Sequence, residues 1–195
     1  MPPKRIMTAL MTVAVAVGSM SCAYGEDKAN LYKEWDSELK EYTRELCEEK
    51  GVNESIVLGI IWNESRFQSD AMGHNTDGTT DYGLMQLNTV TLPFLRENVG
   101  INSMEETLDA KTNIECGVSL LEYYNSFSGG DYESLKMYQT GVGAYNKGVV
   151  HPAYTRVVEA SEEYQEVVDT RDTVETIDKL TVLKVINREI ENNKE

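Results

Sequence analysis

The sequence predicts one all-α domain with at most a small β element. The chain has 195 residues, of which 41% are hydrophobic, and this is enough for one compact domain with its own core. Apolar residues recur at helical spacing in several segments, while only residues 74–83 are dense in Asp, Asn, Gly and Thr. We therefore expect helices packed around one core, with a β-hairpin or polar loop at about 74–83.

The first 25 residues have the layout of a secretory signal peptide. Lys4 and Arg5 precede an uncharged run at 6–17 that is too short to span a bilayer, and small residues follow it. A lipid anchor on Cys22 is disfavoured because the residue three positions upstream is not apolar. We expect residues 1–25 to be removed and the protein to be exported, without stable insertion in the membrane afterwards.

The charge and the cysteines limit the partners and the compartment. A formal net charge of −15 argues against nucleic acid or an anionic membrane as a partner, since binding to these depends on Lys and Arg. Without the signal peptide, Cys47 and Cys116 remain. They predict either one disulfide, as an oxidising compartment permits, or two buried thiols.

The first helix is expected at 30–50, where apolar residues recur every three or four positions. Gly51 is suited to a left-handed C-terminal cap, and Asn53 can cap the helix that follows. Residues 56–62 are apolar almost all the way round, which predicts burial on most sides. A carboxylic acid, Glu64, therefore stands at the end of a buried helix.

Further helices complete the domain, which we place at 26–158. They are expected at 89–98, 112–127, 132–138 and 154–168, with a Gly-rich interruption at 140–148. Residues 159–195 carry 11 acidic and 5 basic side chains but keep near-helical apolar spacing. This acidic extension is predicted to be a terminal helix, packed on the domain or solvated; a partner-docking segment is the alternative.

Glu64 is the first candidate for chemistry. Cleavage of a glycosidic bond needs a proton donor that is still protonated near neutral pH, and a carboxyl gains this property from apolar and aromatic neighbours. Glu64 follows Ile60, Ile61 and Trp62. Taken alone, it is better read as an ordinary surface residue that ends a helix.

Two signatures together are more specific. Residues 62–67 read Trp-Asn-Glu-Ser-Arg-Phe, and residues 81–88 read Asp-Tyr-Gly-Leu-Met-Gln-Leu-Asn. Their order and separation resemble the catalytic segment of the lysozyme and lytic transglycosylase superfamily, which includes secretion-associated muramidase-like proteins. The resemblance is strongest at 52–88 and weaker to about 158. It implies a lysozyme-like fold, with Glu64 as the catalytic acid.

The same resemblance implies residues that position the glycan: Ser65, Met85, Gln86 and a tyrosine. Two registers compete for the family's Ala-Tyr-Asn motif. Residues 144–146 match it letter for letter, which would place Tyr145 and Asn146 in the groove. Residues 137–141, Met-Tyr-Gln-Thr-Gly, match the expected spacing instead, and we favour Tyr138. Either tyrosine could also be a core residue with its hydroxyl satisfied.

Asp81 is a candidate for a second catalytic carboxylate. Residues 75–83 resemble the hairpin of animal-type lysozymes, in which the Asp before Tyr-Gly has that role. A retaining glycosidase holds two carboxyls about 5 Å apart. The alternative is a turn residue that accepts hydrogen bonds from nearby amides.

The resemblance implies an exported bacterial lytic transglycosylase, located in the periplasm or outside the cell. It would cleave the β-1,4 bond after N-acetylmuramic acid in peptidoglycan, with a secretion or conjugation apparatus open as a further partner. The alternatives are a hydrolytic muramidase that uses Glu64 and Asp81, and a non-catalytic glycan-binding module. No cofactor is required, and the sequence offers no metal site: His74 and His151 are isolated, and Gln86 replaces the closing Glu of a calcium loop.

Overall fold

The computed structural model describes residues 28–192, with side chains to residue 186. The expected signal peptide lies outside the described residues. Residues 28–34 are helical. The remaining helices are α2 (Ser37–Lys50), α3 (Glu54–Ser65), α4 (Leu92–Asn98), α5 (Ala110–Ser128), α6 (Asp131–Thr140), α7 (Val142–Tyr145) and α8 (Ala153–Asn192). The strands are β1 (Met72–His74), β2 (Thr80–Tyr82) and β3 (Leu87–Asn88), and the 3-10 turns are η1 (Thr89–Thr91) and η2 (Met104–Leu108). The predicted all-α architecture with a small β element is confirmed.

The helix expected at 30–50 is broken, and this part of the prediction was wrong. The chain leaves the helix at Trp35, whose side chain is buried, and begins α2 after Asp36. The Asp36 carboxylate accepts hydrogen bonds from the backbone N–H groups of Glu38 and Leu39, at 2.8 and 3.0 Å. This side-chain cap starts a new helix at a point where the apolar spacing alone continues. The left-handed cap at Gly51 is confirmed, with φ of 63°.

Helix α3 is the centre of the fold. Asn53 caps it as expected, and Val57, Leu58, Ile60 and Ile61 are fully buried. Helix α8 packs against it very closely: a Cβ added to Gly59 would lie 2.4 Å from the Ser161 hydroxyl. The end of α3, which carries Glu64, is therefore held by the main core.

The β element is a three-stranded antiparallel sheet in the order β1-β2-β3, one strand more than a hairpin. Gly73 pairs with Asp81 between β1 and β2, and Asp81 pairs with Asn88 between β2 and β3. The third strand follows directly on the turn at 83–86, in which Gly83 has φ of 70°. Asp81 thus lies in the central strand.

Asn113 of α5 ties this turn to the helices. Its side chain is fully buried. Its carbonyl oxygen accepts from the Met85 N–H at 2.8 Å, and its amide donates to the Tyr82 and Thr107 carbonyls at 2.9 and 2.7 Å. A Cβ on Gly83 would lie 2.2 Å from the Asn113 amide nitrogen, so the turn can approach α5 only because residue 83 is glycine.

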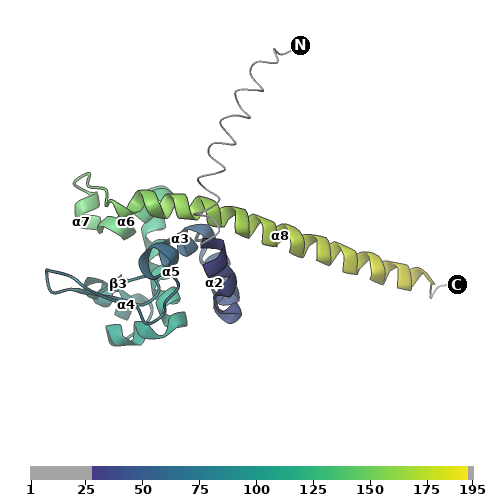
Figure 1. The fold of residues 1–195 in the computed structure, drawn as a ribbon, viewed down its shortest axis with the longest axis horizontal. Coiled ribbons are helices and arrows are strands. Elements are labelled where there is room, and N and C mark those ends of the chain that lie inside the picture. Colours follow the sequence, from purple (N-terminus) through teal and green to yellow (C-terminus); the bar gives the residue numbers. More distant parts are fainter. Residues whose placement is uncertain (1–27, 193–195) are drawn as a thin grey trace, which may run out of the picture.

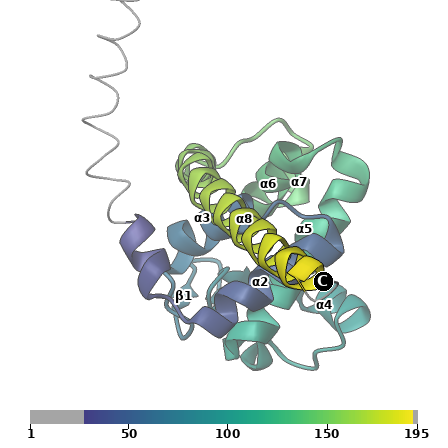
Figure 2. The ribbon, with the colours of Figure 1, turned by 90° about the vertical axis from the view of Figure 1, so that its right-hand side faces the viewer.

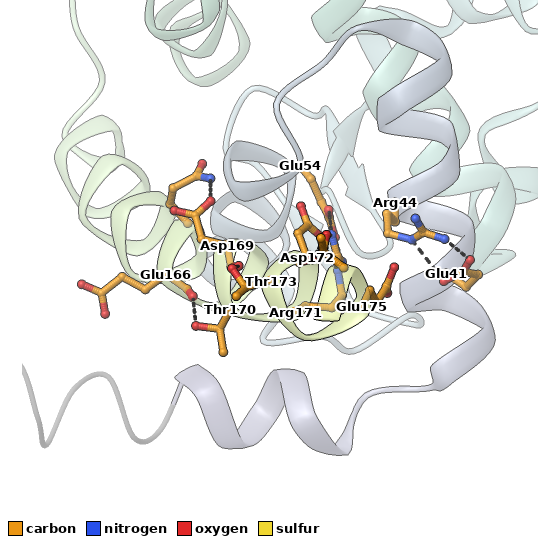
Figure 3. A network of polar contacts seen from close by, with 12 residues as sticks. Glu41, Arg44, Glu54, Glu166, Asp169, Thr170, Arg171, Asp172, Thr173 and Glu175 are labelled. Atoms are coloured by element: carbon orange, nitrogen blue, oxygen red, sulfur yellow. Dashed lines mark hydrogen bonds and ion pairs between the residues drawn. The ribbon is translucent and has the colours of Figure 1, made fainter. Parts of the chain in front are cut away.

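Helix α8 is continuous across residue 158, so the expected boundary between domain and extension falls inside it. Its first part packs on α3, and its C-terminal part extends beyond the other elements (Figure 1; Figure 2). The Arg171 guanidinium binds both oxygens of the Glu54 carboxylate at 2.8 Å, beside the Arg44–Glu41 pair (Figure 3). This bidentate pair anchors α8 to the start of α3.

Beyond Arg171, α8 is solvated. The side chains of Val174, Ile177, Leu180 and Leu183 are between 52% and 57% exposed. The prediction of a terminal helix therefore holds in two parts: a packed first half and a solvated second half. None of the helices in the described part of the chain has the length and apolar character needed to cross a membrane.

Cys47 and Cys116 are free thiols in this structure and are both buried. They belong to different core clusters, with Cys47 in the cluster around α3 and Cys116 in the cluster beneath the sheet. Burial raises the pKa of each thiol to about 12, so both stay protonated and poorly nucleophilic at neutral pH. Of the two possibilities left open by the sequence, the structure has the buried thiols.

Candidate functional site

A cleft of about 930 Å³ lies between the sheet and the helices. Its lining includes the end of α3, the hairpin turn, the turn after β2, and parts of α4, α5, α6 and the start of α8. Five of the eight predicted site residues line it: Glu64, Asp81, Met85, Gln86 and Tyr138. The other three, Ser65, Tyr145 and Asn146, lie elsewhere.

The Glu64 carboxyl is held at one oxygen. Its Oε1 accepts hydrogen bonds from the amides of Asn63 and Gln139, each at 2.9 Å. Arg156 of α8 donates through Nε to the side-chain oxygen Oδ1 of Asn63 at 3.2 Å and so orients the Asn63 side-chain amide. Among the described residues, Oε2 accepts no hydrogen bond. One oxygen of the carboxyl is therefore held by two amides, while the other has no hydrogen-bond partner among the described residues.

Tyr138 joins α6 to the turn after β2. Its hydroxyl donates to the Met85 carbonyl oxygen at 2.8 Å. Burial, and secondly the negative charge of Glu64, raise the pKa of Tyr138 well above its ordinary value. The hydroxyl therefore stays protonated at neutral pH and can keep this hydrogen bond.

Asp81 lies on β2 and lines the cleft. Its Oδ2 accepts from the Asn75 amide at 2.8 Å, and its Oδ1 accepts from the Asn88 amide at 2.7 Å. Both oxygens are thus held by amide donors from neighbouring segments of the sheet. This arrangement fits an oriented carboxylate in the cleft, and it also fits a residue that braces the hairpin.

Gln86 has φ of 46°, a left-handed conformation that is uncommon outside glycine. Its amide donates to the carbonyls of Ala71 and Gly83, at 3.0 and 2.8 Å. The side chain therefore connects the start of β1 to the turn while it lines the cleft. This bracing role is an addition to the glycan contact implied by the sequence.

Ser65, and Tyr145 and Asn146 of the alternative register, do not line the cleft. The buried Ser65 hydroxyl donates to the Ile61 carbonyl one turn earlier in α3, at 3.1 Å. Tyr145 lies on α7, and its hydroxyl donates to Glu133 at 2.7 Å; Asn146 is exposed just after α7. The letter-for-letter register at 144–146 is therefore outside the cleft, and the spacing-based register with Tyr138 is inside it.

The sequence reasoning assigned no role to several residues that line the cleft. Gln139 was detectable, because in the spacing-based register at 137–141 it stands where the Ala-Tyr-Asn motif has Asn. Asn63 and Asn88 lie within the two signatures at 62–67 and 81–88, where the resemblance implied no separate role for them. The aromatic wall formed by Phe94, Tyr123 and Tyr124 has no motif in the sequence, and only the fold brings α4 and α5 together there.

The comparisons with known proteins agree with this geometry. The family described as transglycosylase SLT domain matches residues 41–163. Invasion protein IagB of Salmonella typhimurium is 32% identical over 97 residues, which cover 50% of this chain and 56% of that protein. A peptidoglycan-binding-like protein of Escherichia coli O157:H7 is 28% identical over 102 residues, 49% of this chain and 61% of the relative. The chain thus spans little more than half the length of these curated relatives.

A solved structure is also similar: an inactive variant of the lytic transglycosylase Slt from Pseudomonas aeruginosa, at 25% sequence identity and a TM-score of 0.48. The similarity covers 65% of this chain and 21% of that one. The family match extends from α2 into α8 and encloses every residue that lines the cleft. The chain belongs to the transglycosylase SLT domain family.

Proposed function

We propose that this protein is a lytic transglycosylase of the bacterial cell envelope, which it reaches by export. It cleaves the β-1,4 bond between N-acetylmuramic acid and N-acetylglucosamine in peptidoglycan, with Glu64 as general acid and base. The observation that supports this most is that Glu64 lines the cleft with Oε1 held by two amides, while Oε2 accepts no hydrogen bond among the described residues. We propose a secretion or conjugation apparatus as a further partner.

The geometry suggests how the reaction would run. Two amide donors on Oε1 leave Oε2 to carry the proton, which passes to the glycosidic oxygen as the bond to C1 of the muramic acid breaks. The Glu64 carboxylate then takes the proton of the muramic acid C6 hydroxyl as that oxygen bonds to C1. The products are a 1,6-anhydro sugar and a free N-acetylglucosamine end, and no water is consumed.

Product analysis tests the proposal. Purified peptidoglycan is digested with the protein, and the released muropeptides are weighed by mass spectrometry before and after borohydride reduction. We expect products one water lighter than hydrolytic ones, which borohydride leaves unchanged because they have no reducing end. Reducible products would show a muramidase. No release above the Glu64→Gln control would show a glycan-binding module.

The muramidase remains the second candidate because Asp81 lines the same cleft, with both oxygens held. The variant Asp81→Asn separates the two mechanisms. If Glu64 works with the substrate's own C6 hydroxyl, Asp81→Asn should reduce the rate of muropeptide release by less than about tenfold, because it removes no reacting group. A loss as large as that of Glu64→Gln, in a variant with an unchanged melting temperature, would favour the muramidase.

A further inference from the structure

Four aromatic rings from α4 and α5 form one contiguous cluster at the side of the cleft. Tyr123 is at its centre, with ring centroids 4.9 Å from Phe94, 5.9 Å from Tyr124 and 5.2 Å from Phe127. Tyr124 and Phe127 also meet edge to face, at 6.2 Å. Such tilted and edge-to-face contacts hold the rings in fixed relative orientations. We call these four residues the aromatic shelf.

The aromatic shelf has a fixed inner side and an open outer side. Phe94 and Tyr124 pack against the core cluster beneath the sheet. Tyr123 and Phe127, in contrast, are 49% and 52% exposed. Two large aromatic rings are thus exposed to solvent while the rings beneath them are packed on the core. A contiguous exposed cluster of this kind is typical of a binding surface, whereas single exposed aromatic residues are common on any protein.

The shelf is continuous with the cleft. Phe94, Tyr123 and Tyr124 line the cleft, while Phe127 lies one helical turn beyond Tyr123 on α5 and is not part of the lining. The cleft residues contributed by α4 and α5 include no charged side chain, although the chain as a whole has a net charge of −15. The carboxylates of the cleft, including Glu64 and Asp81, come from other elements.

A neutral aromatic surface suits the flat face of a sugar. In a β-1,4-linked hexosamine the ring substituents are equatorial, so the two faces of each pyranose present C–H groups. These faces are apolar and can stack on an aromatic ring, while the edges keep their hydrogen-bonding groups. A strand that leaves the cleft along α5 would place its next rings over Tyr123 and then Phe127.

We propose that the aromatic shelf is a sugar-stacking site that extends the cleft and selects for longer glycan strands. This inference rests on the proposed function for the identity of the glycan. It assigns Tyr123 and Phe127 to binding alone, because neither is hydrogen-bonded to Glu64 or to the residues that hold it. The shelf therefore changes the affinity for strands long enough to reach it and leaves the reacting bond untouched.

Binding to two strands of different length tests the shelf. A tetrasaccharide and an octasaccharide of alternating N-acetylglucosamine and N-acetylmuramic acid are titrated calorimetrically into Glu64→Gln protein, which does not consume them. With Phe127→Ala added, we expect the dissociation constant of the octasaccharide to rise about fivefold, and that of the tetrasaccharide to stay unchanged. With Tyr123→Ala, the octasaccharide should weaken about tenfold, equivalent to about 1.4 kcal/mol.

Tyr132→Ala is the matched control, because Tyr132 is similarly exposed at 47% but lies on α6 outside the cleft lining. It should change neither dissociation constant, and Phe127→Trp should restore the binding that Phe127→Ala loses. The shelf is refuted if Phe127→Ala and Tyr123→Ala leave octasaccharide binding equal to the control, or if they weaken both strands equally. These titrations measure binding alone, so they stand even if product analysis shows that the protein cleaves nothing.

Discussion

Replacement of Glu64 by glutamine is expected to reduce the rate of muropeptide release by roughly 10² to 10⁴, the usual contribution of a general acid. Glutamine keeps an oxygen that can accept from Asn63 and Gln139, so the shape of the site is preserved. What it removes is the proton that Oε2 would donate and the base that would follow. The measurement is the initial rate of release from purified peptidoglycan, together with calorimetric binding of an octasaccharide, which should be retained.

Glu133→Gln is the control for this variant. Glu133 is also a partly buried, hydrogen-bonded carboxyl, since it accepts from Lys136 and from Tyr145, but it does not line the cleft. Its replacement should leave the rate of release within about twofold, since no transition-state contact is lost. If Glu64→Gln retained the rate of the Glu133→Gln control, Glu64 would not be the acid, and the proposed mechanism would be wrong.

Replacement of Asn113 by alanine is expected to lower the free energy of unfolding by about 3 to 5 kcal/mol. The side chain makes three hydrogen bonds in a fully buried position, and each buried partner left unsatisfied costs about 1 to 3 kcal/mol. This is a large fraction of the stability of an ordinary domain. Urea unfolding followed by circular dichroism measures the change.

The matched comparison is Asn125→Ala on the same helix. Asn125 is only partly buried, and its amide donates to Asp131 at 3.0 Å. Its loss should lower the free energy of unfolding by about 1 kcal/mol or less. Equal effects of the two replacements would mean that the Asn113 network does not stabilise the turn, and that the turn is held by Gly83 and the core alone.

The fold was predictable where local sequence and tertiary packing agree. The cap at Gly51, the buried helix that ends in Glu64, and the turn-rich segment near residue 78 each carry a local signal, and each appears as expected. The break at Trp35 was missed because the apolar spacing continues through it. Only the cap formed by Asp36 ends one helix and begins the next.

The candidate site was predictable only in part, for a similar reason. Glu64 and the segment at 83–86 stand in recognisable motifs. In contrast, Gln139 lies 75 residues from Glu64 along the chain, and its side-chain amide donates one hydrogen bond to the Glu64 carboxyl. The letter match at 144–146 was the alternative register, and matching letters alone do not show where a residue lies in the fold. Spacing favoured Tyr138, and the packing of α6 against α5 puts that residue in the cleft.

The length of α8 has a practical consequence for experiments on this protein. The helix begins at the cleft, which Ala153 and Arg156 line, and it runs to Asn192. At 1.5 Å per residue, the distance along the axis from Arg156 to Asn192 is about 54 Å. A fluorophore, an affinity handle or a solid support coupled at the C-terminal end will therefore stand well clear of the cleft, so immobilised protein can still admit a polymer as bulky as a cell-wall fragment.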